Sequence, residues 1–369
     1  MRFPEFSGEW KETTLGKIAE ITKGSGISKD QLSEQGSPCI LYGELYTKYK
    51  SEIINEVYSR TELDSSPLVK SKANDVIIPC SGETAIDIST ARCVLFNNIL
   101  LGGDLNIIRL KYDDGGFFAY QLNGARKKDI ARVAQGVSVV HLYGENLKQI
   151  RVYYPNIEEQ RKITHLLSLI DGRIATQNKI IEKLQSLIKG IAQHCIKEST
   201  SGNTYVKLGD ICQITTGKLD ANAQVDNGIY PFFTCAEQPF KIDSFAFDTE
   251  ALLISGNGAN LGYINYYKGK FNAYQRTYVL DLFSENIQYI KWALKVLLPK
   301  RIAIEKSSSN TPYIVLSTLT DLRLPIPCKS KQSFIANLMQ SLERKLSNQI
   351  AQYDSYNYLK QYLLRQMFI

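Results

Sequence analysis

The side chains that most often carry out catalysis are few and scattered in this sequence. Its three histidines are His141, His165 and His194, and none has a cysteine or carboxylate cluster at metal-ligand spacing. The seven cysteines stand at positions 39, 80, 93, 195, 212, 235 and 328 and never form a C-x-x-C pair. This odd, dispersed set favours a reduced cytoplasmic protein over a disulfide-linked or zinc-bound one. We therefore expect no metal site and structural roles for the histidines.

Signatures of nucleotide binding and of hydrolysis are missing as well. Residues 256–262, GNGANLG, follow an apolar stretch but lack the G-x-G-x-x-G spacing and the acidic residue downstream. The chain has no G-x-x-x-x-G-K-[ST] loop, G-x-S-x-G elbow or H-E-x-x-H motif, and it lacks the Asp/Asn-Pro-Pro-Tyr/Phe loop of enzymes that methylate amino groups in DNA. We therefore expect a binding protein, not an enzyme, with no cofactor of its own.

Bulk composition limits the class of protein further. The 369 residues leave room for two domains, and 22% charged with 44% hydrophobic residues indicate a globular chain. No apolar run is long enough to span a membrane, and the first ten residues do not resemble a signal peptide. The net charge of +7 is compatible with a nucleic-acid partner without requiring one.

The longest regular pattern covers residues 157–197, which contain two glycines, no proline and apolar residues at steps of three and four. This spacing predicts a long amphipathic helix. Asn156 is the expected N-cap, and Glu159 is expected to complete a capping box.

The same pattern returns at the end of the chain after a shift of 172 residues. Each segment of about 40 residues predicts a helix of about 60 Å. Heptad spacing defines a seam, and Cys195, Met339, Lys360 and Met367 continue it. Its members are Ile163, Leu167, Ile170, Ile174, Gln177, Ile181, Leu184, Ile188 and Ile191 in the first helix, and Ile335, Leu342, Leu346, Gln349, Tyr353, Tyr356 and Leu363 in the second. We expect the two seams to pack on each other; the alternative is that each helix packs separately on a globular core.

The repeat extends beyond the helices. LGKIAEITKG (15–24) returns as LGDICQITTG (208–217), and LKQIRVYYP (147–155) is echoed by LTDLRLPIP (319–327). Between these markers, short apolar runs at 74–83, 105–112, 250–260 and 278–283 predict strands, and 117–130 and 286–302 predict short helices. The predicted fold class is α+β: two similar mixed α/β domains, each followed by a long helix.

These features predict the domain boundaries and the direction of the helices. The expected order is a first domain (1–155), a helix (156–197), a linker (198–204), a second domain (205–327) and a second helix (328–369). A seven-residue linker spans at most about 25 Å, so the second domain must begin near the end of the first helix. We therefore expect an antiparallel coiled coil with a domain at each end, and a pseudo-two-fold axis near Gln177 and Gln349.

Several motifs resemble one known family over essentially the whole chain. W-x₄-LG-x-IAEITKG at the start, YGELYT (42–47), AQGVSVVHL (134–142) and P-x₃-EQ-x-KI (155–163) are typical of the specificity (S) subunit of type I restriction–modification systems. The second copy departs from the pattern, because residues 327–332 keep the proline and the glutamine but lose the acidic residue between them.

The resemblance implies a non-catalytic DNA-binding protein whose two target recognition domains each read one half of a split site in double-stranded DNA. The helices would act as a spacer and would bind two methyltransferase (M) subunits, which carry S-adenosylmethionine. Motor–nuclease (R) subunits, which use ATP and Mg, would join for restriction. Two alternatives remain: a coiled-coil interaction scaffold that does not read DNA, and a stand-alone DNA-modifying enzyme with an unfamiliar site.

Candidate DNA contacts are polar and aromatic side chains in loops, because base edges are read by fixed donors and acceptors and phosphates by cations and hydroxyls. In the first domain they are Tyr42, Glu44, Tyr46, Thr47, Lys48, Lys50, Ser81, Glu83, Arg132, Gln135 and Ser138. In the second they are Lys218, Asn257, Asn260, Tyr263, Gln275, Arg276, Lys306, Ser308, Ser309 and Asn310.

Overall fold

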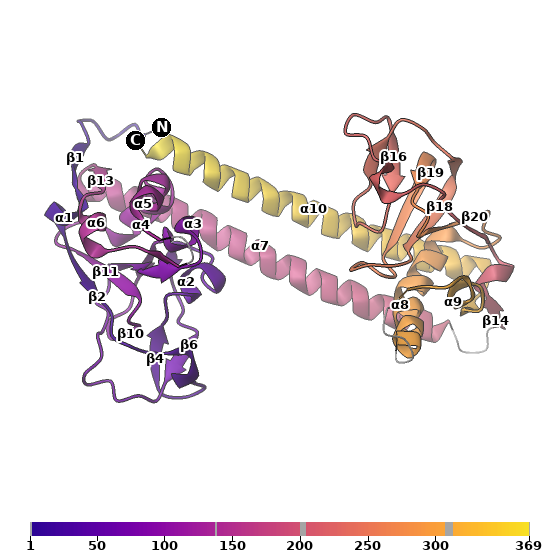
Figure 1. Cartoon of the computed structure of the whole chain (residues 1–369), viewed down its shortest axis with the longest axis horizontal. Coiled ribbons are helices and arrows are strands. Elements are labelled where there is room, and N and C mark those ends of the chain that lie inside the picture. Colours follow the sequence, from indigo (N-terminus) through magenta and orange to yellow (C-terminus); the bar gives the residue numbers. More distant parts are fainter. Residues whose placement is uncertain (1, 137–138, 200–203, 307–312, 369) are drawn as a thin grey trace. The chain divides into compact units, whose positions relative to one another are not determined.

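The computed structural model describes residues 2–136, 139–199, 204–306 and 313–368. It divides into two compact units: residues 1–179 with 351–369 form unit 1, and residues 180–350 form unit 2. Each unit therefore combines a globular domain with part of both long helices (Figure 1).

Unit 1 is built on a five-stranded sheet in the order β2-β11-β7-β9-β5. Its strands are Ala19–Lys23, Leu105–Leu110, Asp75–Pro79, Arg92–Val94 and Ile53–Ile54. A smaller sheet, β10-β4-β6-β3, comprises Leu100–Leu101, Ser37–Ile40, Ser59–Thr61 and Leu32–Ser33. Two pairs complete the unit: β1 (Lys11–Thr14) with β13 (Arg151–Tyr154), and β8 (Ser81–Gly82) with β12 (Val140–His141).

Short helices surround these sheets. They are α1 (Leu15–Ile18), α2 (Glu44–Thr47), α3 (Ala85–Ile88), α4 (Gly115–Asn123), α5 (Lys127–Val133) and α6 (Gly144–Lys148). We predicted one helix over 117–130, but the structure has two, because the chain leaves helical geometry at Gly124 (φ −92°, ψ −99°). Phe117, Phe118 and Tyr120 of α4 are fully buried, so α4 links the five-stranded sheet to the long helices.

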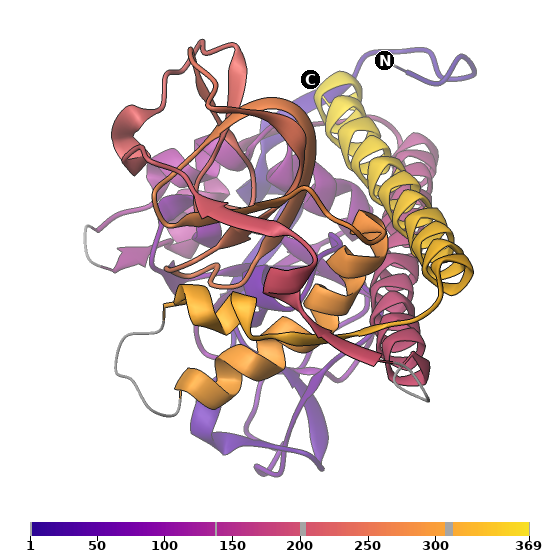
Figure 2. The same ribbon diagram turned by 90° about the vertical axis from the view of Figure 1, so that its right-hand side faces the viewer.

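Unit 2 has one six-stranded sheet, β15-β20-β18-β19-β16-β17. Its strands are Gln213–Thr216, Thr277–Asp281, Phe247–Ser255, Ile264–Ala273, Tyr230–Phe233 and Phe240–Ile242. A separate pair joins β14 (Thr204–Lys207) to β21 (Arg323–Ile326). Helix α8 (Ile287–Lys306) shares one apolar core with this sheet, with α9 (Leu316–Thr320) and with both long helices, and Figure 2 shows α8 and α9 below the sheet.

The two long helices are α7 (Ile157–Glu198) and α10 (Lys329–Met367). Asn156 caps α7 as predicted, since its Oδ1 accepts from the backbone N–H of Glu159 at 2.9 Å. The second half of the predicted capping box is wrong. The Glu159 carboxylate instead accepts two bonds of 2.7 Å from Arg2, because a two-point, charge-assisted bond outcompetes a single neutral N–H.

In unit 1 the helices run in opposite directions along α4. Thr164 of α7 and Phe368, directly after α10, lie beside Gly116 and Phe117, whereas Asp171 and Lys360 meet further along, beside Tyr120. In unit 2, Lys331 near the start of α10 donates to the carbonyl of Glu198 at the end of α7 (3.1 Å). The predicted α+β fold with an antiparallel helix pair is confirmed.

Every predicted seam residue is buried or half-buried. Ile163, Leu167 and Ile170 join the core of unit 1, and Leu184, Ile188 and Ile335 join that of unit 2. The helices thus pack on the globular cores as well as on each other. Both kinds of packing that we considered, helix on helix and helix on globular core, therefore occur. Gln177 is buried and Gln349 half-buried; their predicted pairing and the pseudo-two-fold axis stay predictions.

Each globular domain joins its long helix through the same buried glutamine. In unit 1, Gln160 donates to the Pro155 carbonyl and to the Asp113 carboxylate, both at 2.9 Å, and accepts from the backbone of Asp114. In unit 2, Gln332 donates to the Pro327 carbonyl (2.9 Å) and the Glu285 carboxylate (2.6 Å) and accepts from the Asn286 N–H (3.1 Å). The same three kinds of hydrogen bond are therefore made at this junction in both units, although the residues around the glutamine differ.

Across the described residues, no helix is long and apolar enough to cross a membrane.

Candidate functional site

A glycine at the end of the repeated LG-x-I motif brings two loops together in each unit. A Cβ on Gly24 would lie 2.0 Å from the carbonyl oxygen of Gly102, and one on Gly217 would lie 1.9 Å from that of Ala273. Both glycines donate their N–H across the same turn, Gly24 to Leu105 and Gly217 to Thr277. Only glycine permits so close a backbone approach.

Three further backbone hydrogen bonds are also made twice. In unit 1, the backbone N–H of Gly102 donates to the carbonyl of Ile40, that of Cys80 to Asp104, and that of Leu142 to Cys80. In unit 2, the equivalent donors and acceptors are Tyr274 and Phe233, Gly256 and Arg276, and Ile314 and Gly256. Each unit therefore joins the same set of loops at one end of three neighbouring strands of its main sheet. We call these sets loop cluster 1 (described residues 24–29, 41–50, 80–84, 102–104, 135–136 and 139–141) and loop cluster 2 (217–220, 234–236, 256–263 and 274–276).

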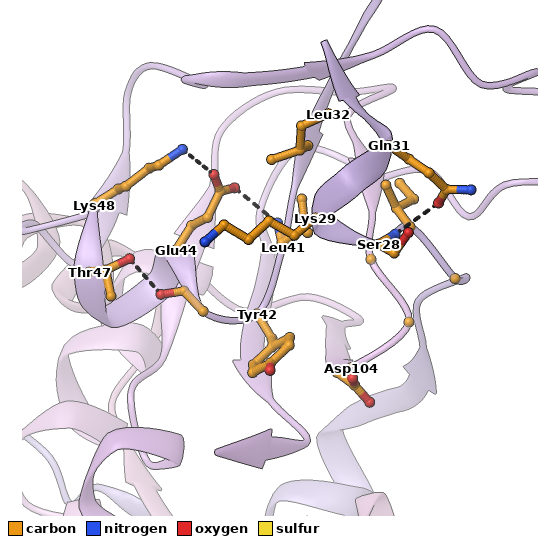
Figure 3. Close-up of a pocket in the computed structure, with 15 residues that line it drawn as sticks. Ser28, Lys29, Gln31, Leu32, Leu41, Tyr42, Glu44, Thr47, Lys48 and Asp104 are labelled. Atoms are coloured by element: carbon orange, nitrogen blue, oxygen red, sulfur yellow. Dashed lines mark hydrogen bonds and ion pairs between the residues drawn. The ribbon is translucent and has the colours of Figure 1, made fainter. Parts of the chain in front are cut away.

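Loop cluster 1 contains a cavity of about 980 Å³. Figure 3 shows the cavity between the segment from Ser28 to Leu32, the α2 loop with Tyr42, and Asp104 in the loop before β11. The rim carries two cations, Lys29 and Lys48. A space of this size with cationic, phenolic and carboxylate groups can bind a polar ligand by hydrogen bonds and charge.

Glu44, which we predicted as a contact, is committed to the protein interior. Its buried carboxylate accepts from the Leu41 N–H (3.0 Å), from Lys48 (2.6 Å) and from the hydroxyl of Ser59. A carboxylate with three internal donors shapes its own loop, so Glu44 is better described as the residue that holds the α2 loop than as a contact to a ligand.

The other predicted residues of the α2 loop line the cavity or lie beside it. Tyr42 and Tyr46 are half-buried, and burial, with Tyr42, Asp87 and Glu83 nearby, raises the pKa of Tyr46. The Thr47 hydroxyl donates to the Gly43 carbonyl (2.7 Å), and Lys50 donates to that of Thr47 (3.0 Å). These bonds stabilise the loop; Lys48 and Lys50 are exposed residues, and the ammonium of Lys48 is paired with Glu44.

A second group of predicted residues meets on the β8–β12 pair. Ser81 pairs with His141, and Gln135 exchanges two backbone hydrogen bonds with the same histidine (2.9 and 2.7 Å). Glu83 is exposed just beyond Ser81, and Arg132 is exposed at the end of α5, where it pairs with Asp129 at 3.2 Å. Ser138 lies outside the described residues.

In loop cluster 2 the predicted asparagines surround Cys235. The Cys235 thiol donates to Asn257 Oδ1 (3.0 Å), and Asn260 Nδ2 donates to the Cys235 carbonyl (3.0 Å). The Arg276 side chain is exposed next to them, and its carbonyl lies 3.6 Å from the same thiol. The amide groups are thereby held in fixed orientations.

The remaining predicted residues of unit 2 extend this cluster. Gln275 donates to the Asp220 carboxylate (2.7 Å), and exposed Lys218 precedes that residue by two positions. Tyr263 is exposed at the end of the 256–263 loop. Ser308, Ser309 and Asn310 lie outside the described residues, as does the side chain of Lys306.

The described residues contain no group of three or more His, Cys, Asp or Glu that could hold a metal ion. The side chains brought together are donors, acceptors, cations and aromatic rings, which suit recognition.

Comparison with known proteins identifies the family. The model of the type I restriction modification DNA specificity domain matches residues 7–186 and again 200–353. The chain belongs to this family. Each specificity domain, as matched, contains one loop cluster, and the two matches together include most of both long helices.

Relatives and solved structures agree with the family match. The EcoDI specificity subunit of Escherichia coli is 44% identical over 137 residues, covering 37% of this chain and 30% of that protein. The MjaIX specificity subunit of Methanocaldococcus jannaschii is 25% identical over 58% of this chain and 59% of its own length. The matched part thus spans less than two thirds of either relative. The crystal structure of a type I S subunit from M. genitalium shares the fold, with a TM-score of 0.71, 18% identity, and coverage of 100% of this chain and 99% of that one.

Sequence reasoning missed part of both specificity-domain sites. In loop cluster 1 these residues are Ser28, Lys29 and Asp104, with Gln31 on the wall of the cavity, and in loop cluster 2 they are Asp220 and Cys235. A signal was present, because shifting the predicted Gln275 and Arg276 back by 172 positions gives Gly103 and Asp104. Cys235 gave no such signal, since only the fold places it beside Asn257.

Proposed function

We propose that this chain is a DNA-recognition subunit in which each loop cluster reads one half of a split sequence. The observation that supports this is the double construction of the site: the same backbone hydrogen bonds join the same loops in both units. The same backbone framework occurs in both units and carries different side chains. This arrangement suits two domains that recognise different DNA sequences.

The equivalent positions differ in chemistry. Tyr42, Ser81 and Asp104 of loop cluster 1 correspond to Cys235, Asn257 and Arg276 of loop cluster 2. Arginine commonly reads guanine and asparagine adenine, whereas carboxylates accept from cytosine. The half-sites are therefore expected to differ in sequence. Lys29, Lys48, Lys50 and Lys218 are suited to phosphate contacts, which set position and salt dependence.

We further propose that methyltransferase subunits bind the long helices and supply S-adenosylmethionine, and that motor–nuclease subunits supply ATP and Mg chemistry. The helices carry large exposed apolar side chains, among them Phe334 (66% exposed) and Tyr358 (76%). Exposed apolar groups on otherwise polar helices suit protein contacts. A solved structure of similar fold, with 16% identity and a TM-score of 0.59, concerns complex assembly of the type I R-M system.

Modification mapping tests this proposal. DNA from cells that express the chain with the methyltransferase from its own locus should carry methylated adenines in both halves of one split motif. Replacing residues 205–326 with the matching segment of another family member should change one half and leave the other intact.

Three outcomes would count against it. If both halves change after the replacement, the units do not read independently. If the purified chain alone methylates or cuts DNA, it is an enzyme, and if the co-expressed pair modifies no motif, a scaffold is the better description.

A further inference from the structure

Four charged side chains are buried together in unit 1, beside the α2 loop. They are Glu52, Arg92, Asp171 and Lys360, each 7–8% exposed. Lys360 of α10 lies 2.5 Å from the Glu52 carboxylate and 2.6 Å from that of Asp171 on α7. The other Asp171 oxygen accepts from the hydroxyls of Ser51 and Tyr120, both at 2.8 Å.

The formal charges of these four side chains sum to zero: Lys360 pairs directly with Glu52 and Asp171, and Arg92 interacts with the same two carboxylates through longer-range charge. Burial opposes charge on the Lys360 ammonium, but Glu52 and Asp171 outweigh it and raise its pKa. Loss of one partner would leave an uncompensated buried charge, which is strongly destabilising. The cluster therefore holds only while α10 contributes its lysine.

Arg92 connects this cluster to the site. Its guanidinium donates to the carbonyls of Leu45 (3.1 Å) and Tyr49 (2.9 Å), which lie in and just after α2. On the other side, the Glu52 carbonyl accepts from the Cys93 N–H at 2.8 Å. Ser51 and Glu52 follow the loop directly, so both ends of the 45–52 segment are tied to buried charge.

Unit 2 uses another solution. At the positions 172 residues away, Lys360 corresponds to the buried apolar Ile188, and Tyr120 corresponds to Trp292. Asp171 corresponds to Glu343, which is half-buried and pairs with Lys291 (2.7 Å) and Lys295 (3.2 Å) of α8. The charged connection between α10 and a recognition loop is thus a feature of unit 1.

We propose that Lys360 is a positioning residue for recognition: through Glu52, Asp171 and Arg92, the C-terminal helix sets the conformation of the α2 loop in loop cluster 1. This inference rests on the proposed function for its consequence, because the loop carries candidate contacts such as Tyr42 and Lys48. Its structural part, the coupling of α10 to the loop, stands on the contacts alone.

Hydrogen exchange of the intact chain with Lys360→Met tests the coupling. The N–H groups of Thr47, Lys48 and Tyr49, which bond to Gly43 and Glu44, should exchange about tenfold to a hundredfold faster than in the natural chain. Glu52→Gln with Lys360→Met removes the link but leaves Arg92 and Asp171 balanced. This double variant keeps the test valid if the single variant folds poorly, and it should also show faster exchange of the loop.

Lys291→Met is the matched control, since it removes a buried lysine paired with a long helix in unit 2. It should leave exchange at residues 41–50 unchanged. Unchanged exchange at these residues in the double variant would overturn the proposal.

The consequence for recognition is read from methylation in the partner complex. Discrimination at the half-site read by unit 1 should relax in both Lys360 variants, and the other half should stay strict. Faster hydrogen exchange in the loop, with unaltered discrimination at the half-site read by unit 1, would overturn the positioning role. If the natural chain reads no split motif, the proposed function fails, while hydrogen exchange still decides the coupling.

Discussion

At the scale of single residues, the site depends on a few positions where one atom decides the packing. Gly24 and Gly217 are the clearest, because each lies against a backbone carbonyl that cannot move without breaking the adjoining strands. Cys235 is another, since its thiol and carbonyl orient two asparagines. Such positions control the shape of the loops, and the exposed side chains then determine what is bound.

Gly24→Ala should open loop cluster 1. Its methyl group would fall 2.0 Å from the Gly102 oxygen, and relieving such overpacking costs about 1–3 kcal/mol or more. The free energy of unfolding measured in urea should fall, and discrimination at the half-site read by unit 1 should weaken. Gly26→Ala is the control for stability, because nothing lies within 4 Å of its Cβ, and an equal loss of stability in both variants would refute this explanation.

The Tyr289 phenol should make unit 2 less stable at alkaline pH. Burial raises its pKa to about 12, and its hydroxyl donates to the Pro325 carbonyl at 2.6 Å. The unfolded phenol ionises near pH 10. Between these values the folded state binds more protons, so this contribution to stability is complete below pH 10 and is lost towards pH 12.

Tyr289→Phe isolates that contribution. The variant should be less stable by about 1–3 kcal/mol at pH 7, because the Pro325 carbonyl loses its donor. The difference from the natural chain should shrink as the pH rises from 10 to 12 in urea titrations. A difference that stays constant with pH would contradict the assignment.

At the scale of elements, the long helices belong to the globular units as much as to each other. Gln160 and Gln332 fix where each helix begins relative to its sheet, through three hydrogen bonds apiece. The seam residues then bury one face of each helix. Helix position and site position are therefore linked through short, buried contacts.

Gln332→Ala should loosen the junction of α10 with unit 2. The Pro327 carbonyl and the Asn286 N–H would lose their partner, at a cost of about 1–3 kcal/mol. Hydrogen exchange at residues 286–290 should report the change. Gln352→Ala on the exposed part of the same helix should have little effect, and comparable losses would argue against a special junction.

At the scale of the whole molecule, two compact units each contain a complete loop cluster. The backbone hydrogen bonds that define each cluster are made between residues of one unit. Recognition by one unit should therefore be energetically independent of recognition by the other.

Paired substitutions test this independence. Tyr42→Ala should weaken DNA binding by the complex through one half-site and Arg276→Ala through the other, each by about 1–3 kcal/mol. Combined, the two losses should add within about 0.5 kcal/mol. Strong non-additivity in binding titrations at fixed salt would show that the sites are coupled.

The sequence alone determined the internal repeat, the fold class, the two long helices and the family, because periodic burial and duplicated motifs are local patterns. It also located most of the loops of the site, since strands ending in glycine and polar residues are visible in the chain. Tertiary structure decided which side chains in those loops are available. Glu44 is consumed by internal donors, Glu159 bonds to Arg2 instead of completing its cap, and Lys360 interrupts an apolar seam to neutralise two distant carboxylates. The reason is that hydrogen bonds and buried charges pair residues far apart in the chain, and spacing along a sequence carries no record of that pairing.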